Sequence, residues 1–291
     1  MEEKISVVIP TFKRPDRLTR ALNSVLNQTY SNFEILVIDD DNMGEESLNV
    51  VENFNDDRIM FFKNNRSKGA NGARNMGVIH ATGNFIAFLD DDDEWLPIYL
   101  ESQLKTLEST DKMTGMVYGG YLLEKNNNWK ENFQNKEGDL FSAIILDQVY
   151  IGASSNIFIK REVIDHVGLW DEELLRQQDL EFLIRVFDKY LTVFNPKIIL
   201  KVYGHNDPAP IKSFNSREVF YNKVQNQLEK LSESEKRAFI SIHFRRQALY
   251  KLQMSDFIGA KENWLKAFHH KKFSFKKDAK LCLALLKLLP Y

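Results

Sequence analysis

Cysteine, long apolar runs and net charge are all scarce in this chain, and each scarcity excludes a class of protein. The 291 residues contain one cysteine, Cys282, so neither an intrachain disulfide nor a cysteine-based zinc site can form. No stretch approaches the roughly 20 apolar residues that a membrane-spanning helix needs. Nucleic-acid-binding proteins carry a surplus of basic residues, whereas this chain has a net charge of −2. We therefore expect no nucleic-acid partner.

Three further motifs are missing. No G-x-G-x-x-G follows the first apolar run, and no G-x-x-x-x-G-K-[ST] occurs anywhere, which argues against dinucleotide-binding and P-loop sites. The opening MEEKISVVIP is acidic and its apolar run is too short for a secretory signal. We therefore expect a cytoplasmic protein in a reducing compartment.

The first hundred residues alternate between two hydrophobic patterns. Short apolar runs rich in Val, Ile and Phe are typical of strands buried on both faces of a parallel sheet. Between them lie segments with helical spacing, the first of which opens with Pro15, a residue suited to a first helical turn. This order predicts a doubly wound α/β domain. The expected strands cover 5–10, 33–40, 58–63 and 85–90, and the expected helices cover 15–28, 45–54, 70–81 and 97–108.

Polar clusters follow three of these strands: PTFKR after the first, DDDN after the second and DDDDE after the fourth. Ligands bind outside the carboxyl ends of strands in such sheets. Two unit charges about 5 Å apart repel by roughly 3 kcal/mol at an effective dielectric near 20. The aspartates at 90–93 therefore need either full solvation, as in an ordinary loop, or a cation. We favour a site for a divalent cation, because the three clusters should converge.

The rest of the chain is organised differently. Residues 115–203 mix strand-like runs with one clear helix at 179–189, and 204–216 is polar and loop-like, with two prolines and a glycine. From Arg217 onward the pattern is helical. We therefore predict a catalytic domain at 1–216 and a helical region at 217–291, with two amphipathic helices around a turn at 254–259.

Taken together, three segments closely resemble glycosyltransferase family 2. They are ISVVIPTFKRPDRLTRALNSVLNQTYSNFEILVIDD, GARNMGVIHATGNFIAFLDDDDEW and VGLWDEELLRQQDLEFLIRV, in the family's order and near its spacing. The resemblance covers about residues 4–205. It implies an inverting, metal-dependent enzyme of the GT-A fold that takes a sugar from a nucleotide-diphosphate donor, with a UDP-sugar favoured.

The resemblance places the aspartate run where the family has its D-x-D motif, which holds Mg²⁺ or Mn²⁺ on the donor diphosphate. Hard divalent ions prefer carboxylate and phosphate oxygens, and they neutralise charge on a departing diphosphate. By position, Asp92 is the expected metal ligand. Asp90 and Asp91 are expected to serve the ribose or groups around the metal, and Asp93 only to be solvated.

The nucleotide is expected to lie across the first two strand ends. Pro10 and Thr11 offer backbone groups, Phe12 an aromatic face for the base, with an ordinary core aromatic as the alternative, and Arg14 a cation.

Asp39 and Asp40 match the family's acidic pair, and Asp40 is favoured as the acceptor of the base N–H. The family continues with Gly-Ser, whereas Asp41 and Asn42 stand here, so the base preference stays open.

The diphosphate is expected to meet a cation from KGANGARN, which resembles a glycine-rich segment of the family. Arg74 is favoured, since a guanidinium suits bidentate phosphate contact. Lys68 is a weaker candidate. His205 follows a strand where GT-A enzymes often place a histidine near the metal, although a lone histidine at such a position is often unremarkable. Trp95 is expected to pack, with a contact to the acceptor or the donor sugar as the alternative.

An inverting transfer needs a base that takes the acceptor hydroxyl proton. Family members use the aspartate of a Glu-Asp pair after a G-x-[FW]-D-E segment, here GLWDE at 168–172. Asp179 stands at the base position, and Gln178 replaces the glutamate. The alternative is that Asp179 only caps the helix 180–189.

The implied partners are a nucleotide-sugar donor and a saccharide, lipid-linked or glycoprotein acceptor. From Lys261 to Tyr291 eight lysines face only Glu262 and Asp278, a net charge of +6. This end predicts a homo-oligomer contact or peripheral binding at the inner face of the membrane, with packing on the catalytic domain as the alternative. A nucleotide-sugar sensor or inactive partner subunit is the alternative function, which only Gln178 favours. A haloacid-dehalogenase type phosphotransferase is disfavoured, because IPTFKR stands where its D-x-D-x-[TV] would be.

Overall fold

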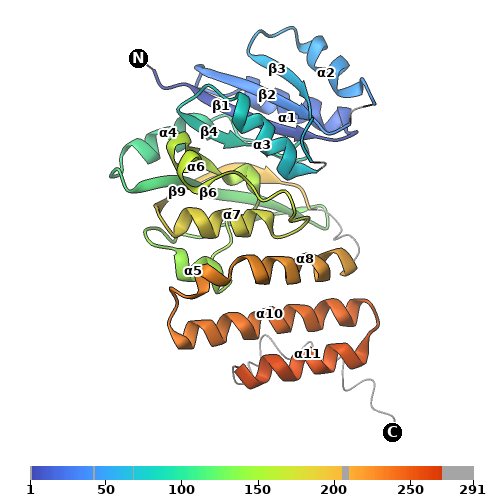
Figure 1. Cartoon of the computed structure of the whole chain (residues 1–291). Helices are drawn as coiled ribbons and strands as arrows, with labels where there is room; N and C mark the ends of the chain where they lie inside the picture. Colours follow the sequence, from blue (N-terminus) through green and yellow to red (C-terminus); the bar gives the residue numbers. More distant parts are fainter. Residues whose placement is uncertain (1, 42, 68, 205–209, 271–291) are drawn as a thin grey trace. The chain divides into compact units, whose positions relative to one another are not determined.

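The computed structural model describes residues 2–41, 43–67, 69–204 and 210–270. The chain forms two compact units, each built from several stretches of sequence (Figure 1). The first unit comprises Met1–Phe141, Val149–Glu172 and Phe182–His205, and the second comprises Ser142–Gln148, Glu173–Glu181 and Asn206–Tyr291.

The first unit is built on a nine-stranded sheet in the order β3-β2-β1-β4-β8-β6-β9-β5, with β7 paired to β6. The first four strands of this order are parallel. Every residue of β1 and β2 is buried, because these strands are largely apolar, and the polar Ser6 and Glu34 pair with each other in the interior. These strands are β1 (Ile5–Thr11), β2 (Phe33–Asp39), β3 (Ile59–Lys63) and β4 (Phe85–Phe88).

The other half of the sheet is mixed. β8 is antiparallel to both β4 and β6, so β6 runs in the direction of β4, and β9 is parallel to β6. The carboxyl ends of β1, β2, β4, β6 and β9 therefore meet at one edge of the sheet. The strands of this half are β5 (Glu94–Trp95), β6 (Thr114–Lys125), β7 (Asn128–Asn132), β8 (Phe158–Lys160) and β9 (Leu191–Val202).

Helices cover the sheet with their apolar sides. α1 starts at Pro15, and its Leu18, Leu22 and Val25 are fully buried, each stabilising the fold by roughly 1.5–3 kcal/mol. In α3, a Cβ on Gly77 would lie 2.3 Å from Cγ1 of Val8, so only glycine allows this helix to approach β1 so closely. The helices with most of their residues in this unit are α1 (Pro15–Leu26), α2 (Glu46–Phe54), α3 (Ala70–His80), α4 (Tyr99–Glu108), α6 (Arg161–Val167) and α7 (Gln178–Phe187).

The second unit is helical. Ser232 and Glu235 form a reciprocal capping box at the start of α10, which satisfies two backbone N–H groups there. α8 and α11 both lie beside α10 (Figure 1). No helix in the described ranges is long and apolar enough to cross a membrane. The main helices of the second unit are α8 (Pro210–Lys223), α9 (Gln225–Leu228), α10 (Glu233–Gln253) and α11 (Phe257–His270). α5 (Phe141–Ile145) begins at the border of this unit.

The structure confirms the alternating strands and helices of the first hundred residues, and the α10–α11 pair around a short turn. One expectation was wrong. Within the loop-like segment 204–216, α8 already begins at Pro210, because proline is well tolerated in a first helical turn. The boundary near 216 stays a prediction. His205 and the lysine-rich residues 271–291 lie outside the described residues.

Candidate active site

Polar side chains from five elements gather where the carboxyl ends of the strands meet. Thr11 ends β1 and Asp39 ends β2, while the aspartates at 90–93 follow β4. Ser155 belongs to the short helix η1 (Ser154–Asn156), which lies two residues before the antiparallel β8, and Tyr203 follows β9. The topology therefore brings together residues that are far apart in the sequence, as the three polar clusters predicted.

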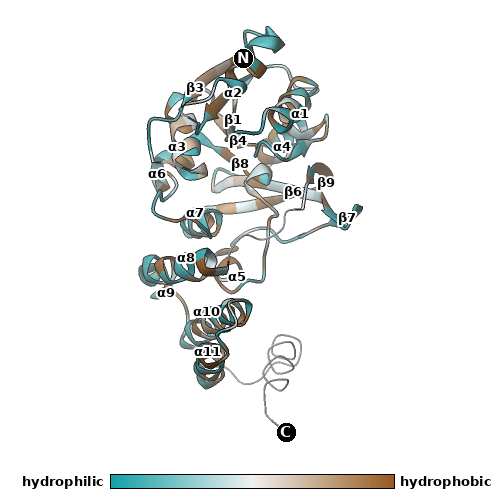
Figure 2. Cartoon of the chain, turned by 90° about the vertical axis from the view of Figure 1, so that its right-hand side faces the viewer, coloured by the Kyte–Doolittle hydropathy of each residue, from teal (hydrophilic) through white to brown (hydrophobic). Residues whose placement is uncertain are grey.

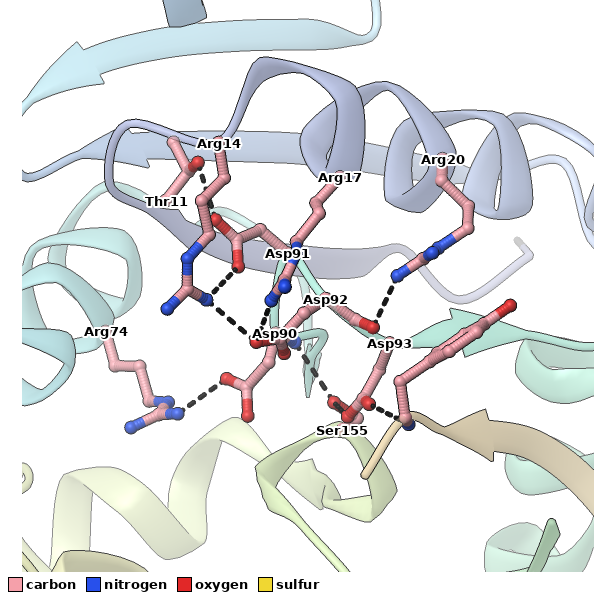
Figure 3. A network of polar contacts seen from close by, with 11 residues as sticks. Thr11, Arg14, Arg17, Arg20, Arg74, Asp90, Asp91, Asp92, Asp93 and Ser155 are labelled. Atoms are coloured by element: carbon pink, nitrogen blue, oxygen red, sulfur yellow. Dashed lines mark hydrogen bonds and ion pairs between the residues drawn. The ribbon is translucent and has the colours of Figure 1, made fainter. Parts of the chain in front are cut away.

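Two of the aspartates are held by residues of β1 and α1 (Figure 3). Thr11 Oγ1 donates to Asp91 Oδ2 at 2.8 Å. One nitrogen of Arg14, Nη1, lies 3.1 Å from Asp91 Oδ1 and 2.7 Å from Asp92 Oδ2, so it bridges the two carboxylates. Arg17 Nη1 adds a contact to Asp92 Oδ2 at 3.3 Å. Arg14 and Arg17 are three residues apart around the start of α1 and so reach the same side.

The other two arginines of Figure 3 approach from different directions. Arg74, only 3% exposed, lies in α3 and donates from Nη2 to Asp90 Oδ1 at 2.6 Å. Arg20 of α1 donates from Nη2 to the backbone oxygen of Asp92 at 2.6 Å. Its guanidinium also lies 3.9 Å from the centre of the Tyr203 ring. These cations offset part of the repulsion within the aspartate run.

Burial sets the proton affinity of two of these aspartates. Burial, followed by the neighbouring charge of Asp92, raises the pKa of Asp91, although the hydrogen bond from Thr11 and the charge of Arg14 oppose the rise. Asp93 is only 2% exposed, and its burial raises its pKa to about 8, with the charge of Asp90 adding to the effect. The negative charge of Asp91 and Asp93 is thus incompletely compensated by their partners.

The expectation that Asp93 is merely solvated was wrong. Ser155 Oγ donates to Asp93 Oδ2 at 2.6 Å, and the backbone N–H of Tyr203 donates to Oδ1 at 3.2 Å. Ser155 Oγ in turn accepts from the backbone N–H of Asp90 at 3.0 Å. Asp93 therefore ties the aspartate run to η1 and to the end of β9, because those elements close over it.

The acidic pair after β2 is divided between two surroundings. Asp39 is buried, which raises its pKa, and its Oδ1 accepts from the backbone N–H of Asp41. Asp40 is half-buried and accepts from Asn64 Nδ2 at 2.7 Å and from the Gly69 backbone N–H at 2.8 Å. Asp40 thereby anchors the start of α3.

Phe12 is 50% exposed, so the alternative of an ordinary core aromatic was wrong. The expected packing of Trp95 is confirmed, since it is buried and stacks on Tyr99 with ring centres 3.9 Å apart. Pro10 is buried within β1. Lys68 lies outside the described residues.

Glu172, in the GLWDE segment, holds the turn before α3. It accepts from Arg66 Nε at 2.6 Å, from Ser67 Oγ at 2.6 Å and from Asn75 Nδ2 at 2.8 Å. Burial works to raise its pKa, but these three donors outweigh it and lower the pKa to about 2. The sequence motif was the only signal for this residue, since its partners lie about a hundred positions away.

Asp179 lies at the second residue of α7, in the first turn with Glu181. The helix starts at Gln178, so the alternative that Asp179 only caps a helix beginning at 180 was wrong, while its role as the base stays a prediction. An acid in a first turn is favoured by the helix dipole. Asp179 belongs to the second unit, whereas the aspartate run belongs to the first.

The donor set of the aspartate run fits a hard divalent cation. Asp91 and Asp92 already share one positively charged nitrogen of Arg14, which shows that their oxygens can converge on a single cation. Within residues 2–41, 43–67, 69–204 and 210–270, no group of three or more His, Cys, Asp or Glu side chains is placed to hold a metal. A cation here would complete its shell with diphosphate oxygens and water, as Mg²⁺ commonly does.

Comparison with known families agrees with this geometry. The family model "Glycosyl transferase family 2" matches residues 6–168, more than half of the chain. The chain therefore belongs to glycosyltransferase family 2.

The curated relatives include an Escherichia coli protein, UDP-Glc:alpha-D-GlcNAc-diphosphoundecaprenol beta-1,3-glucosyltransferase WfgD. It is 39% identical over 123 residues, which are 42% of this chain and 47% of the relative. A Campylobacter jejuni GalNAc(5)-diNAcBac-PP-undecaprenol beta-1,3-glucosyltransferase is 40% identical over 137 residues, 46% of this chain and 43% of the relative. The chain spans about half the length of these relatives.

Solved structures show the same fold. Staphylococcus aureus TarS 1-349 in complex with UDP-GlcNAc superposes with a TM-score of 0.67 at 16% identity, over 95% of this chain and 83% of that one. The mannosyltransferase PcManGT from Pyrobaculum calidifontis, in complex with GDP-Man and Mn²⁺, gives a TM-score of 0.56 at 14% identity, over 99% and 81%. The fold is the GT-A fold, with helices following it, as the sequence predicted.

Proposed function

We propose that this protein is an inverting, metal-dependent glycosyltransferase that moves a sugar from a UDP-sugar to a hydroxyl of a lipid-linked saccharide. The observation that carries the proposal is the convergence of Arg14, Arg17 and Arg74 on the carboxylates of the aspartate run, at the strand edge where α/β sheets bind ligands. Such a site has both the anionic groups that hold a cation and the cations that meet a diphosphate.

The donor nucleotide is proposed to lie across the ends of β1 and β2. Asp40 would accept from the base N–H, with Asp39 behind it, and the exposed ring of Phe12 would pack on the base. Backbone groups of Pro10 and Thr11 line this position. The ribose would meet Asp90 and Asp91, whose carboxylates accept hydrogen bonds from hydroxyl groups.

The diphosphate is proposed to lie between the aspartate run and the arginines. Asp92 would hold Mn²⁺ or Mg²⁺, with His205 as a further candidate ligand. When bound, the cation neutralises charge on the departing diphosphate. Arg14 and Arg74 would contact phosphate oxygens, and Lys68 would add a weaker contact.

The base is proposed to be Asp179, which would take the proton of the acceptor hydroxyl on the face opposite the departing diphosphate. Two relatives carry names that describe diphosphoundecaprenol or PP-undecaprenol acceptors, which favours a lipid-linked acceptor over a glycoprotein. Such an acceptor would bring a cytoplasmic enzyme to the inner face of the membrane. The helical region 217–291 is proposed to serve that contact or self-association.

A donor screen tests the proposal. The protein is incubated with Mn²⁺ and separate UDP-, GDP-, dTDP- and CMP-sugars, and release of the nucleotide is measured without acceptor. We expect slow hydrolysis confined to UDP-sugars. If the protein bound none of these donors, the proposal would be overturned.

Gln178 favours one other function, a nucleotide-sugar sensor or inactive partner subunit, because the family's glutamate is missing beside the base. Tight donor binding without hydrolysis, and without transfer to any lipid-linked acceptor, would identify it.

A further inference from the structure

An exposed tryptophan stands beside the candidate site in a hairpin that neither the family motifs nor the proposed donor site uses. Trp129 lies in β7 and is 43% exposed. Its ring forms a T-shaped pair with the Tyr203 ring, with centres 5.1 Å apart and planes at 82°. Trp129 and Tyr203 are called the aromatic wall below. Tyrosine and tryptophan are enriched at contact surfaces, because each combines a large apolar ring with a polar group.

The hairpin is built to extend past the end of the sheet. Asn126 and Asn127 have φ angles of 53° and 61°, as a tight two-residue turn requires. Trp129 lies opposite Glu124, near the carboxyl end of β6. Figure 2 shows β7 beside the end of β6. Val117 is in register with Phe158, which pairs with Ala87 of β4, so Glu124 lies seven residues beyond the level of Ala87. At about 3.3 Å per residue, the wall rises past the strand end that carries the aspartates.

Three contacts fix Tyr203 of the aromatic wall to the aspartate run and to the adjacent Glu94. The backbone N–H of Tyr203 donates to Asp93, and its hydroxyl donates to Glu94 at 3.0 Å. Arg20 covers the Tyr203 ring and donates to the backbone oxygen of Asp92. Tyr203 therefore connects the aspartate run to Trp129 and to any molecule that binds there.

The order of the strands indicates which substrate, donor or acceptor, would lie beside the aromatic wall. Along the sheet, β2 and β1 precede β4, whereas β8, β6 and β9 follow it. With the nucleotide over β2 and β1 and the diphosphate at the end of β4, the acceptor must enter from the side of β6 and β9. The charged residues beside Trp129 on β7, Lys130 and Glu131, disfavour insertion of this ring into lipid.

We propose that Trp129 is a binding platform for a pyranose ring of the acceptor saccharide. One face of a pyranose presents C–H groups, which pack on the electron-rich face of an indole ring. Tyr203 and Arg20 hold the platform at a fixed place relative to the aspartates. The inference rests on the proposed function, because it takes the acceptor to be a saccharide.

The test compares Trp129→Ala with Phe133→Ala in the full chain. Phe133 is similarly exposed, at 46%, but packs over Gly120, farther back along β6. Binding of short-chain pyranosyl diphosphate lipids to the protein saturated with UDP and Mn²⁺ is followed by saturation-transfer NMR. UDP affinity and acceptor-free donor hydrolysis are measured on the same samples, and a melting curve checks folding.

Trp129→Ala should weaken binding of the pyranosyl lipid about tenfold, the size expected of one aromatic contact. Trp129→Phe should restore most of it, and Phe133→Ala should match the wild type. UDP affinity and donor hydrolysis should not change in any variant. Equal pyranoside binding by wild type and Trp129→Ala, or no binding by the wild type, would overturn the inference. A loss of donor affinity in Trp129→Ala would also overturn it, by placing the ring on the donor sugar. If the wild type binds no nucleotide sugar, the proposed function itself fails.

Discussion

Buried carboxylates lie at both edges of the same sheet, a single glutamate at one and the aspartate run at the other, and their surroundings differ. Glu34, near the amino end of β2, is buried and accepts from Ser6 Oγ, from Lys4 and from both the N–H and the hydroxyl of Thr82. Burial works to raise its pKa, but these donors outweigh it and lower the pKa. At the carboxyl ends, burial raises the pKa of Asp91 and Asp93 despite their partners.

From this difference we infer that Glu34 serves stability and that the aspartates at 90–93 serve binding. Four donors around one carboxylate leave little for a ligand to add. Within the aspartate run, Asp91 and Asp93 have raised pKa values, so a cation that arrives there stabilises their ionised forms. A change at Glu34 should therefore alter stability alone, whereas a change in the aspartate run should alter binding.

The largest effect is expected at Asp179, a third kind of carboxylate, whose proposed role is chemical. Asp179→Asn keeps the size of the side chain but removes its basicity. Transfer should fall on the order of 10²-fold or more, because general-base catalysis contributes about that much. UDP affinity and melting temperature should stay near wild type. Normal turnover in the variant would remove Asp179 as the base.

Glu34→Gln tests the carboxylate at the amino-end edge of the sheet. Loss of the negative charge weakens four hydrogen bonds, so the free energy of unfolding should drop by about 1–3 kcal/mol at pH 7. Because the folded pKa of Glu34 is lowered, its contribution is present above the unfolded pKa near 4.3 and disappears as pH falls through the folded value. Denaturant titrations at pH 7 and pH 3 measure this. Unchanged UDP binding is the control, and a loss of UDP binding would break the distinction between the edges.

Asp93→Asn should change stability with the opposite sign. The folded pKa of Asp93 is raised to about 8, so wild-type stability is fully present below the unfolded pKa near 3.9 and declines as pH rises toward 8. The asparagine imitates the protonated acid. In EDTA, the melting temperature of the variant relative to wild type should therefore rise between pH 5 and pH 8. A flat difference over that range would show that Asp93 is ionised without cost.

Much of this arrangement could be predicted from the sequence, because it depends on local pattern. Short apolar runs gave the strands, and the family motifs pointed to the aspartate run. Burial of Asp93 could not be predicted, since Ser155 and the Tyr203 N–H lie 62 and 110 positions away. The aromatic wall was missed although Asn126–Asn127 is a recognisable turn signal. The start of α8 at Pro210 was not predicted, because the two prolines and the glycine of 204–216 together indicate a loop, although Pro210 lies in a first helical turn.

The central claim is that the aspartate run binds a nucleotide diphosphate through a divalent cation. Calorimetric titration of UDP, with Mn²⁺ and after EDTA, tests it most directly in wild type and in Asp92→Asn. We expect UDP to bind the wild type at least about tenfold more tightly with Mn²⁺, because the cation joins carboxylate to diphosphate. Asp92→Asn should stay folded and lose that difference. Equal UDP affinity of the wild type with and without Mn²⁺ would contradict the account.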